Sequence, residues 1–455
     1  MPGRSADDTW SGPVFAWSES VLGTRARWGT LLLVVGLWLS GCVTEAQSPE
    51  PPVRTGAEVL AQHQFEALAG ERVGVIANHT ARVDTAHLVD RLADTPDVHV
   101  KAIFAPEHGI RGTAGAGETI EGGRDARTGV PVHSLYDATR RPTPDELAGL
   151  DALVFDVQAV GARFYTYITT MGLAMQAAAE ANLRFVVLDR PNPLGGTYTA
   201  GFVLEPAHQS FVGRYPIPIA HGLTIGELAR YIQQQKLLPG VASLDLSVVE
   251  MTGWTRGMQW PDTGREWRPP SPNLPTWDTA LLYPGLCLFE GVRVSEGRGT
   301  ERPFLQIGTS WPPAAAQRVV DTLRAHKLPG IAVDTVAFTP RAMPQAAPSP
   351  RFEGRRVHGV ELTVTDRRAV DPMRTGIHAL HAMYHQAQAQ DDTAFVSRPA
   401  HLTRLAGTDR LLRQLRTGVS PDSIVASWRR EVEAFREKRA SAVLYGPAGA
   451  GPGGS

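Results

Sequence analysis

Continuous apolar runs alternate with segments of helical periodicity over the first half of the chain. The runs that predict buried strands cover residues 72–77, 98–105, 151–157 and 185–189. The predicted helices cover residues 85–94, 169–182 and 224–238, and Thr224 with Glu227 forms a capping-box pattern at the start of the last one. Strands that are apolar throughout are typical of a parallel sheet with helices on both faces. We therefore predict an α/β domain, built on a parallel sheet, over residues 58–240.

A different pattern begins near residue 240. Residues 241 to about 345 are rich in Pro, Gly and Trp, and the later segments 356–364 and 402–439 favour a smaller α+β domain. We place this second domain at residues 241–445. Residues 446–455 are Gly, Pro and Ala with a final Ser, so we predict a disordered tail.

The N-terminus carries a targeting signal. Arg25 and Arg27 precede an apolar run that is shorter than the about 20 residues that span a bilayer. The run ends in Leu39-Ser-Gly-Cys42, which resembles the lipobox of bacterial lipoproteins. We predict a signal peptide over residues 1–41, lipidation of Cys42 and a tether over residues 42–57. The protein is then exported and lipid-anchored in the bacterial cell envelope, on the periplasmic or outer-membrane side. A plain signal peptide or a short anchor is the alternative.

Composition narrows the classes of function. The chain has 45 Lys and Arg against 46 Asp and Glu, a formal net charge of −1, which argues against a nucleic-acid binder held by a basic face. Its 42% hydrophobic and 20% charged residues are typical of a globular protein. If lipid occupies Cys42, the other cysteine, Cys287, has no partner for an internal disulfide. The fold then depends on its hydrophobic core.

Polar and aromatic residues follow the predicted strands where each strand ends. They are Asn78 after the first strand, Glu107 and His108 after the second, Asp156, Arg163 and Tyr165 at the third, and Asn192 after the fourth. Ligands of open α/β sheets bind beyond the carboxyl ends of the strands. Each residue also has a structural alternative, since Asp156, for example, can pair with Arg163 to hold a loop. Their number at one rim predicts a functional site.

The motif content excludes several chemistries. No G-x-G-x-x-G joins a strand to a helix, and P-loop, H-E-x-x-H and G-x-S-x-G patterns are absent. The histidines lack close metal-ligand spacing, so we predict neither a metal site nor a cofactor. Carboxylates in the company of arginines and aromatic rings remain, and carboxyl groups hydrolyse glycosidic bonds. These residues are compatible with a glycosidase, and arginine suits a sugar that bears a carboxylate.

Longer motifs contain these same residues. They are Phe104-Ala-Pro-Glu-His-Gly109, Val154-Phe-Asp-Val-Gln158, Val160-Gly-Ala-Arg-Phe-Tyr-Thr-Tyr167, Leu188-Asp-Arg-Pro-Asn-Pro193, Pro270-Ser-Pro-Asn273, Leu288-Phe-Glu-Gly291, and Ser295-Glu-Gly-Arg-Gly-Thr300 with Arg302. In this order they resemble the DUF1343 family, whose characterised members are exo-β-N-acetylmuramidases of the NamZ type. The resemblance implies a Rossmann-like N-terminal domain, a smaller C-terminal domain and an active site in the cleft between them. It also implies release of N-acetylmuramic acid from the non-reducing ends of peptidoglycan glycans.

Roles for single residues follow from the resemblance and from their positions. We predict catalytic roles for Glu107, His108, Asp156 and Glu296, with Glu107 as the general acid. We predict substrate contacts from Asn78, Arg163, Tyr165, Asn192, Asn273, Glu290, Arg298 and Arg302. The glycines beside Arg298 predict a tight loop at residues 295–300, and we expect this loop to face Glu107 across the cleft, with Asn273 and Glu290 nearby. Arg163 is the first choice for binding the lactyl carboxylate of N-acetylmuramic acid, with Arg298 and Arg302 as alternatives.

Two places depart from the family pattern. His79 and Ala81 stand where the family has Gln and Gly, and Ala159 stands where it has a second Asp after the third strand. Ala159 keeps a second function open, that of a non-catalytic envelope lipoprotein that binds muropeptides or cell-wall sugars. A metal-dependent amidase or deacetylase is a third, but it needs a histidine cluster that the spacing does not offer. The sequence leaves open whether the mechanism is retaining, inverting or substrate-assisted, the oligomeric state and the choice of membrane.

Overall fold

The computed structural model describes residues 52–112, 123–136 and 139–447. The predicted signal peptide, Cys42, most of the predicted tether and the tail from residue 448 lie outside these residues. Within the described part, no helix is long and apolar enough to cross a membrane.

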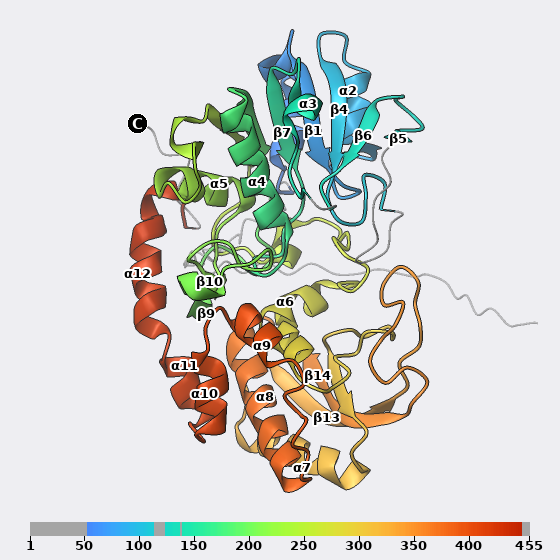
Figure 1. Ribbon diagram of the computed structural model, residues 1–455, viewed down its shortest axis with the longest axis vertical. Coiled ribbons are helices and arrows are strands. Elements are labelled where there is room, and N and C mark those ends of the chain that lie inside the picture. Colours follow the sequence, from blue (N-terminus) through green and yellow to red (C-terminus); the bar gives the residue numbers. More distant parts are fainter. Residues whose placement is uncertain (1–51, 113–122, 137–138, 448–455) are drawn as a thin grey trace, which may run out of the picture. The chain divides into compact units, whose positions relative to one another are not determined.

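A seven-stranded sheet forms the first half of the fold (Figure 1). Its strands are β1 (Arg72–Ala77), β4 (His99–Ala105), β5 (Gly123–Arg124), β6 (Pro131–Ser134), β7 (Ala152–Asp156), β8 (Arg184–Leu188) and β11 (Leu246–Val249), in the order β11-β8-β7-β1-β4-β6-β5. All neighbours are parallel except β5 and β6. Without β5, the order is that of a Rossmann fold, in which the chain reverses direction across the sheet between β1 and β7. The predicted α/β class is confirmed.

Helices cover both faces of this sheet because its strand residues alternate between two cores. Ile76 and Phe155 belong to one core with residues of α4 (Tyr167–Glu180) and α5 (Ile225–Gln234). Val75 and Val154 belong to the other core with residues of α1 (Gly56–Gln62) and α2 (Leu88–Ala93). The short α3 (Pro144–Leu147) precedes β7. The predicted capping box of Thr224 and Glu227 is confirmed at α5.

The second half has a smaller antiparallel sheet. Its strands β12 (Gln306–Thr309), β13 (Ile331–Phe338) and β14 (Val357–Val364) lie in the order β12-β14-β13. The helices are α6 (Trp277–Leu286), α7 (Pro313–Ala325), α8 (Pro372–Ala389), α9 (Pro399–Ala406), α10 (Arg410–Arg416), α11 (Pro421–Ala426) and α12 (Arg429–Arg439). The other strands of the described residues form two short pairs, β2 (Arg82–Val83) with β3 (Ala86–His87) and β9 (Ala200–Val203) with β10 (Pro218–Ala220). The predicted smaller α+β part is confirmed.

The structure corrects three predicted boundaries. β11 pairs with β8, so the first half continues past residue 240. The tether ends earlier than residue 57, because Val53 is buried and Thr55 caps α1. The helix predicted at 85–94 begins only after His87, whose side chain accepts a hydrogen bond from Val89 N. These errors lie at element ends, where the apolar pattern carries least information.

Candidate active site

Glu107 lies in a tight turn directly after β4. Gly109 N donates to Pro106 O at 3.0 Å, and His108 has a φ of 74°, a left-handed value that non-glycine residues rarely adopt. The half-buried Glu107 carboxylate accepts a hydrogen bond from the Thr166 hydroxyl at 3.4 Å. Burial, together with the Glu107 carboxylate beside it, raises the pKa of the Tyr136 hydroxyl to about 12. Glu107 is thus held by groups that can donate to it.

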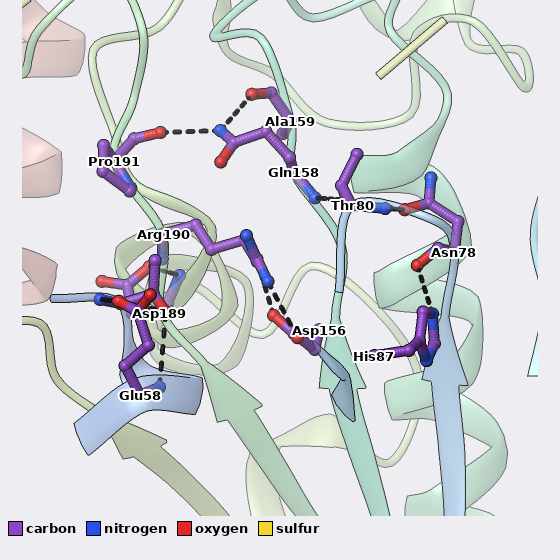
Figure 2. A network of polar contacts seen from close by, with 12 residues as sticks. Glu58, Asn78, Thr80, His87, Asp156, Gln158, Ala159, Asp189, Arg190 and Pro191 are labelled. Atoms are coloured by element: carbon purple, nitrogen blue, oxygen red, sulfur yellow. Dashed lines mark hydrogen bonds and ion pairs between the residues drawn. The ribbon is translucent and has the colours of Figure 1, made fainter. Parts of the chain in front are cut away.

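A chain of buried hydrogen bonds joins this turn to the ends of β1 and β7, and Figure 2 shows the part of it that runs from Asn78 through Thr80 to Gln158. The Tyr167 hydroxyl lies 3.2 Å from Glu107 O and accepts from Asn78 Nδ2 at 3.0 Å. Asn78 Oδ1 accepts from Thr80 Oγ1 at 2.6 Å, and Thr80 Oγ1 accepts from Gln158 N at 3.1 Å. Asn78 is fully buried and both ends of its amide bond to protein groups, so it holds the ends of β1 and β7 together with the Glu107 turn, and its predicted substrate contact stays a prediction.

Asp156, at the end of β7, is paired with Arg190 and not with Arg163. Its two carboxylate oxygens accept from Arg190 Nε at 2.5 Å and Nη2 at 2.9 Å (Figure 2). Both side chains are buried. Without exposed surface and bonded through both oxygens, the Asp156 carboxylate acts as a positioning group in this structure, and its catalytic role stays a prediction. The Ala159 carbonyl accepts a hydrogen bond from Gln158 Nε2 at 2.8 Å, and its side chain packs against the hydrophobic core.

Arg163 is bonded to backbone carbonyl groups of two separate segments. It is fully buried, and it donates to Phe202 O at 2.7 Å, Ile217 O at 2.9 Å and Leu405 O at 2.8 Å. Burial lowers the pKa of its guanidinium to about 9. Its Nη1 and Nη2 groups thus bind the β9–β10 hairpin and the end of α9, which is a bracing arrangement, and a contact of Arg163 with the lactyl group stays a prediction.

Two predicted asparagines also brace loops. Asn192 Nδ2 donates to Leu223 O at 2.9 Å, and its Oδ1 accepts from Leu194 N at 3.0 Å. Asn273 Nδ2 donates to Ala346 O at 2.5 Å. Both side chains are buried and donate to backbone carbonyls, so each braces a loop, and their predicted substrate contacts stay predictions.

A second group of charged residues forms around Arg298 in the loop before β12. Arg298 Nη2 lies 2.7 Å from Glu290 Oε1, and its Nε lies 3.2 Å from Glu296 Oε1. Gly297 and Gly299, with φ of 82° and 78°, give the tight loop that the sequence predicted. His401 of α9 lies 3.4 Å from Glu290 Oε2, a contact that no sequence pattern indicated. Arg302 lies apart from this group, paired with Glu361 at 2.9 Å.

The environments of Glu290 and Glu296 push their pKa values apart. Burial opposes ionisation of Glu290, but Arg298 and His401 outweigh it and lower the pKa of its carboxyl to about 2. Burial raises the pKa of Glu296, the charge of Glu290 adds to that rise, and Arg298 opposes it. A permanent carboxylate beside one that can hold a proton is an arrangement found in acid–base sites.

A row of aromatic rings links the two groups of residues. Tyr165 lies between Tyr167, with ring centres 5.0 Å apart, and Tyr283 of α6, at 6.0 Å. Tyr283 contacts Phe304 at 5.0 Å, and the Arg298 guanidinium lies 5.1 Å from the centre of the Phe304 ring. Tyr165 is thus packed in this row. The rings connect the residues around Glu107 with those around Glu296, while a direct opposition of the two carboxyls across a cleft stays a prediction.

A cavity of about 260 Å³ opens beyond the carboxyl ends of β1, β7 and β8. Its wall includes Thr80, Gln158, Trp260, four arginines (Arg82, Arg190, Arg265, Arg268), Asp84 and Glu266. No role was predicted for any of these residues from the sequence, although Thr80, Gln158 and Arg190 follow predicted strands. Asp156-x-Gln158 and Asp189-Arg190 at strand ends were the signals that could have found Gln158 and Arg190. Among the described residues, no three His, Cys, Asp or Glu side chains gather as metal ligands.

Comparison with known proteins places the chain in a family. Its residues 73–278 match the model described as the N-terminal part of exo-β-N-acetylmuramidase NamZ, and residues 281–445 match the C-terminal part. The chain belongs to this family. The peptidoglycan β-N-acetylmuramidase NamZ of Bacillus subtilis (strain 168) is 39% identical over 426 residues, which are 90% of this chain and 98% of that protein.

Solved structures agree with the family. Two DUF1343 family proteins of Bacteroides fragilis NCTC 9343 superpose with TM-scores of 0.78 and 0.72, at 33% and 34% identity. Each comparison covers 87% of this chain, with 99% of the first structure and 100% of the second. The boundary between the two family models lies near residue 280, which agrees with the place of β11 in the first sheet.

Proposed function

We propose that this protein is an exo-acting glycoside hydrolase that releases N-acetylmuramic acid from the non-reducing ends of peptidoglycan glycans. The observation that carries the proposal is Glu107, a half-buried carboxylate at a strand end of a chain that matches the NamZ family over both halves. Thr166 donates to this carboxylate and Tyr136 contacts it, so the side chain is fixed where a proton donor is needed.

Hydrolysis of the glycosidic bond needs a proton for the departing sugar oxygen. It also needs a second group that attacks the anomeric carbon or activates a water molecule to attack it. In our proposal Glu107 donates the proton. The second group is another carboxyl or the acetamido group of the substrate itself. Glu296 is our candidate for the carboxyl, because it is buried and lies 3.2 Å from the Arg298 guanidinium, whose charge favours the ionised form that this role needs. Hydrolysis in this way requires no cofactor.

The test of the activity is release of a chromophore from two matched substrates. Purified protein incubated with a chromogenic N-acetylmuramide should release the chromophore, while the matching N-acetylglucosaminide should react far more slowly. Peptidoglycan glycans that end in N-acetylmuramic acid should lose that residue one at a time. Tight binding of these glycans without any release would contradict the proposal and support the alternative of a non-catalytic binding lipoprotein.

We also propose that a lipid on Cys42 anchors the enzyme in the cell envelope. The support is the Leu-Ser-Gly-Cys sequence after a short apolar run, together with a family whose substrate lies in the envelope. Cys42→Ser should move the protein from the detergent phase to the aqueous phase in a Triton X-114 partition. Cys287→Ala, at a cysteine buried in the core, is the matched control and should stay in the detergent phase. Unchanged partitioning of Cys42→Ser would exclude the anchor.

A further inference from the structure

We propose that the cavity beyond β1, β7 and β8 receives the lactyl carboxylate of the N-acetylmuramyl residue, and that Arg268 and Arg82 bind it. We call this space the arginine cavity; Thr80, Arg82, Gln158, Arg190, Trp260 and Arg268 are the lining residues that matter here. The inference rests on the proposed function and deepens it, because it names the residues that distinguish N-acetylmuramic acid from N-acetylglucosamine.

The position of the cavity in the fold is the first argument. Thr80 follows β1 and Gln158 follows β7, so the cavity lies where the strand order of the sheet reverses. Ligands of open α/β sheets bind in the crevice at this point. Its wall is also connected to the proposed proton donor, since buried hydrogen bonds run from Gln158 through Thr80, Asn78 and Tyr167 to the backbone of Glu107.

The loop that carries Arg268 is bonded to the same network of hydrogen bonds. The two residues that follow it, Pro269 and Pro270, accept hydrogen bonds from His79 Nε2 at 2.8 Å and from the Tyr167 hydroxyl at 3.0 Å. One tyrosine hydroxyl therefore lies against the backbone of both Glu107 and the Arg268 loop. Buried hydrogen bonds thus couple the Arg268 loop to the turn that carries the proposed proton donor, and such positioning is what orientation of one sugar ring requires.

The state of the arginines is the second argument. Arg190 is bonded to Asp156, and Arg265 is bonded to Glu58 at 2.6 and 2.8 Å. The positive charge of each is therefore already paired with a carboxylate of the protein. Arg268 is different: its side chain is 49% exposed and its pair with Glu266 is long, at 3.6 Å. Arg82 Nε is buried without a hydrogen-bond partner among the described residues.

An unpaired buried donor is costly, and a carboxylate removes that cost. A guanidinium can also bind both oxygens of a carboxylate at once, which lysine or an amide cannot do. Gln158 Oε1, likewise buried and without a partner in the described chain, can accept from a hydroxyl or amide N–H of the same sugar. Arg82 and Arg268 therefore offer positive charge for the lactyl carboxylate, the negatively charged group that N-acetylmuramic acid has and N-acetylglucosamine lacks.

The three arginines that the sequence suggested for this role are occupied elsewhere. Arg163 is bound to backbone carbonyls, Arg298 lies between two glutamates, and Arg302 is paired with Glu361. Arg82 and Arg268 are therefore better placed to bind the lactyl group, although their positions in the sequence did not indicate this role.

The experiment varies the charge on both partners. Arg268→Met and Arg82→Met are assayed for kcat/KM on a chromogenic N-acetylmuramide and on its lactyl methyl ester, which has the same shape without the charge. Each variant should lose about 10- to 100-fold on the acid and less than about 2-fold on the ester. Arg268→Lys should recover part of the loss, since it keeps the charge and loses the fork. Arg356→Met, at an exposed arginine before β14, is the matched control and should change neither rate.

The outcomes separate this inference from the proposed function. Equal losses on acid and ester, or none in either variant, would overturn the role of the cavity while the muramidase activity of the unaltered protein stands. If the unaltered protein cleaves neither substrate, the proposed function fails, and calorimetric titration with N-acetylmuramic acid and its methyl ester still tests the cavity. Preference for the acid that disappears in Arg268→Met would support it there too.

Discussion

Glu107→Gln should lower kcat on a chromogenic N-acetylmuramide by about 10²- to 10⁴-fold and leave the fold intact. Glutamine has the shape of glutamate and can still accept the hydrogen bond from Thr166, so the turn after β4 keeps its contacts. It has no proton to give to the departing sugar oxygen. The loss should therefore fall on the chemical step, with KM little changed.

The leaving group gives the sharpest measurement of this effect. A dinitrophenyl group departs with little help from an acid, so Glu107→Gln should lose much less activity on that glycoside than on one with a poor leaving group. Glu353→Gln, at an exposed glutamate in the loop before β14, is the control and should match the unaltered protein on both. A Glu107→Gln enzyme with near-normal turnover on the poor leaving group would remove Glu107 from the mechanism.

The sheet was predictable because burial on both faces leaves a plain trace in the sequence. The strand predicted at 72–77 is β1, and those predicted at 98–105, 151–157 and 185–189 overlap β4, β7 and β8 closely. β11 was missed because its residues are not fully buried. It pairs only with β8 at the sheet edge, all four of its residues are partly exposed, and its short run of Leu, Ser and Val residues does not stand out. Because this strand was missed, the boundary predicted at residue 240 falls before β11, which belongs to the first sheet.

The location of the site could be predicted from the sequence, but the partners of its side chains could not. Glu107, Asn78 and Gln158 lie at strand ends, and in a parallel sheet such ends meet at one rim. Whether a side chain at the rim faces a ligand or the protein depends on residues far away in sequence. Leu405 binds Arg163, Glu361 binds Arg302, and His401 contacts Glu290 across separations that no local pattern reports. Arg190 and Arg163 both follow strands, and only their tertiary partners separate their roles.

Arg163→Met should lower the free energy of unfolding by about 3–5 kcal/mol, because it leaves the three carbonyl oxygens of Phe202, Ile217 and Leu405 buried without these donors. The backbone packs closely against this guanidinium. Gly407 has a φ of 77°, and a Cβ there would come within 2.5 Å of Arg163 Nη2, so only glycine fits at this position. Urea denaturation measures the loss, with Arg302→Met as the control. The Arg302 pair is partly exposed, so its removal should cost less than about 1 kcal/mol.

The kinetics of the same variant separate a bracing arginine from a substrate-binding one. At a temperature where Arg163→Met stays folded, kcat/KM should fall by the same factor on the N-acetylmuramide and on its lactyl methyl ester, since the α9 contact holds the fold and touches neither substrate. A loss confined to the charged substrate, with unchanged stability, would show that the guanidinium leaves its carbonyls to bind the sugar. The position of Arg163 after the third strand would then have indicated its role correctly, and its full burial would describe only the state without substrate.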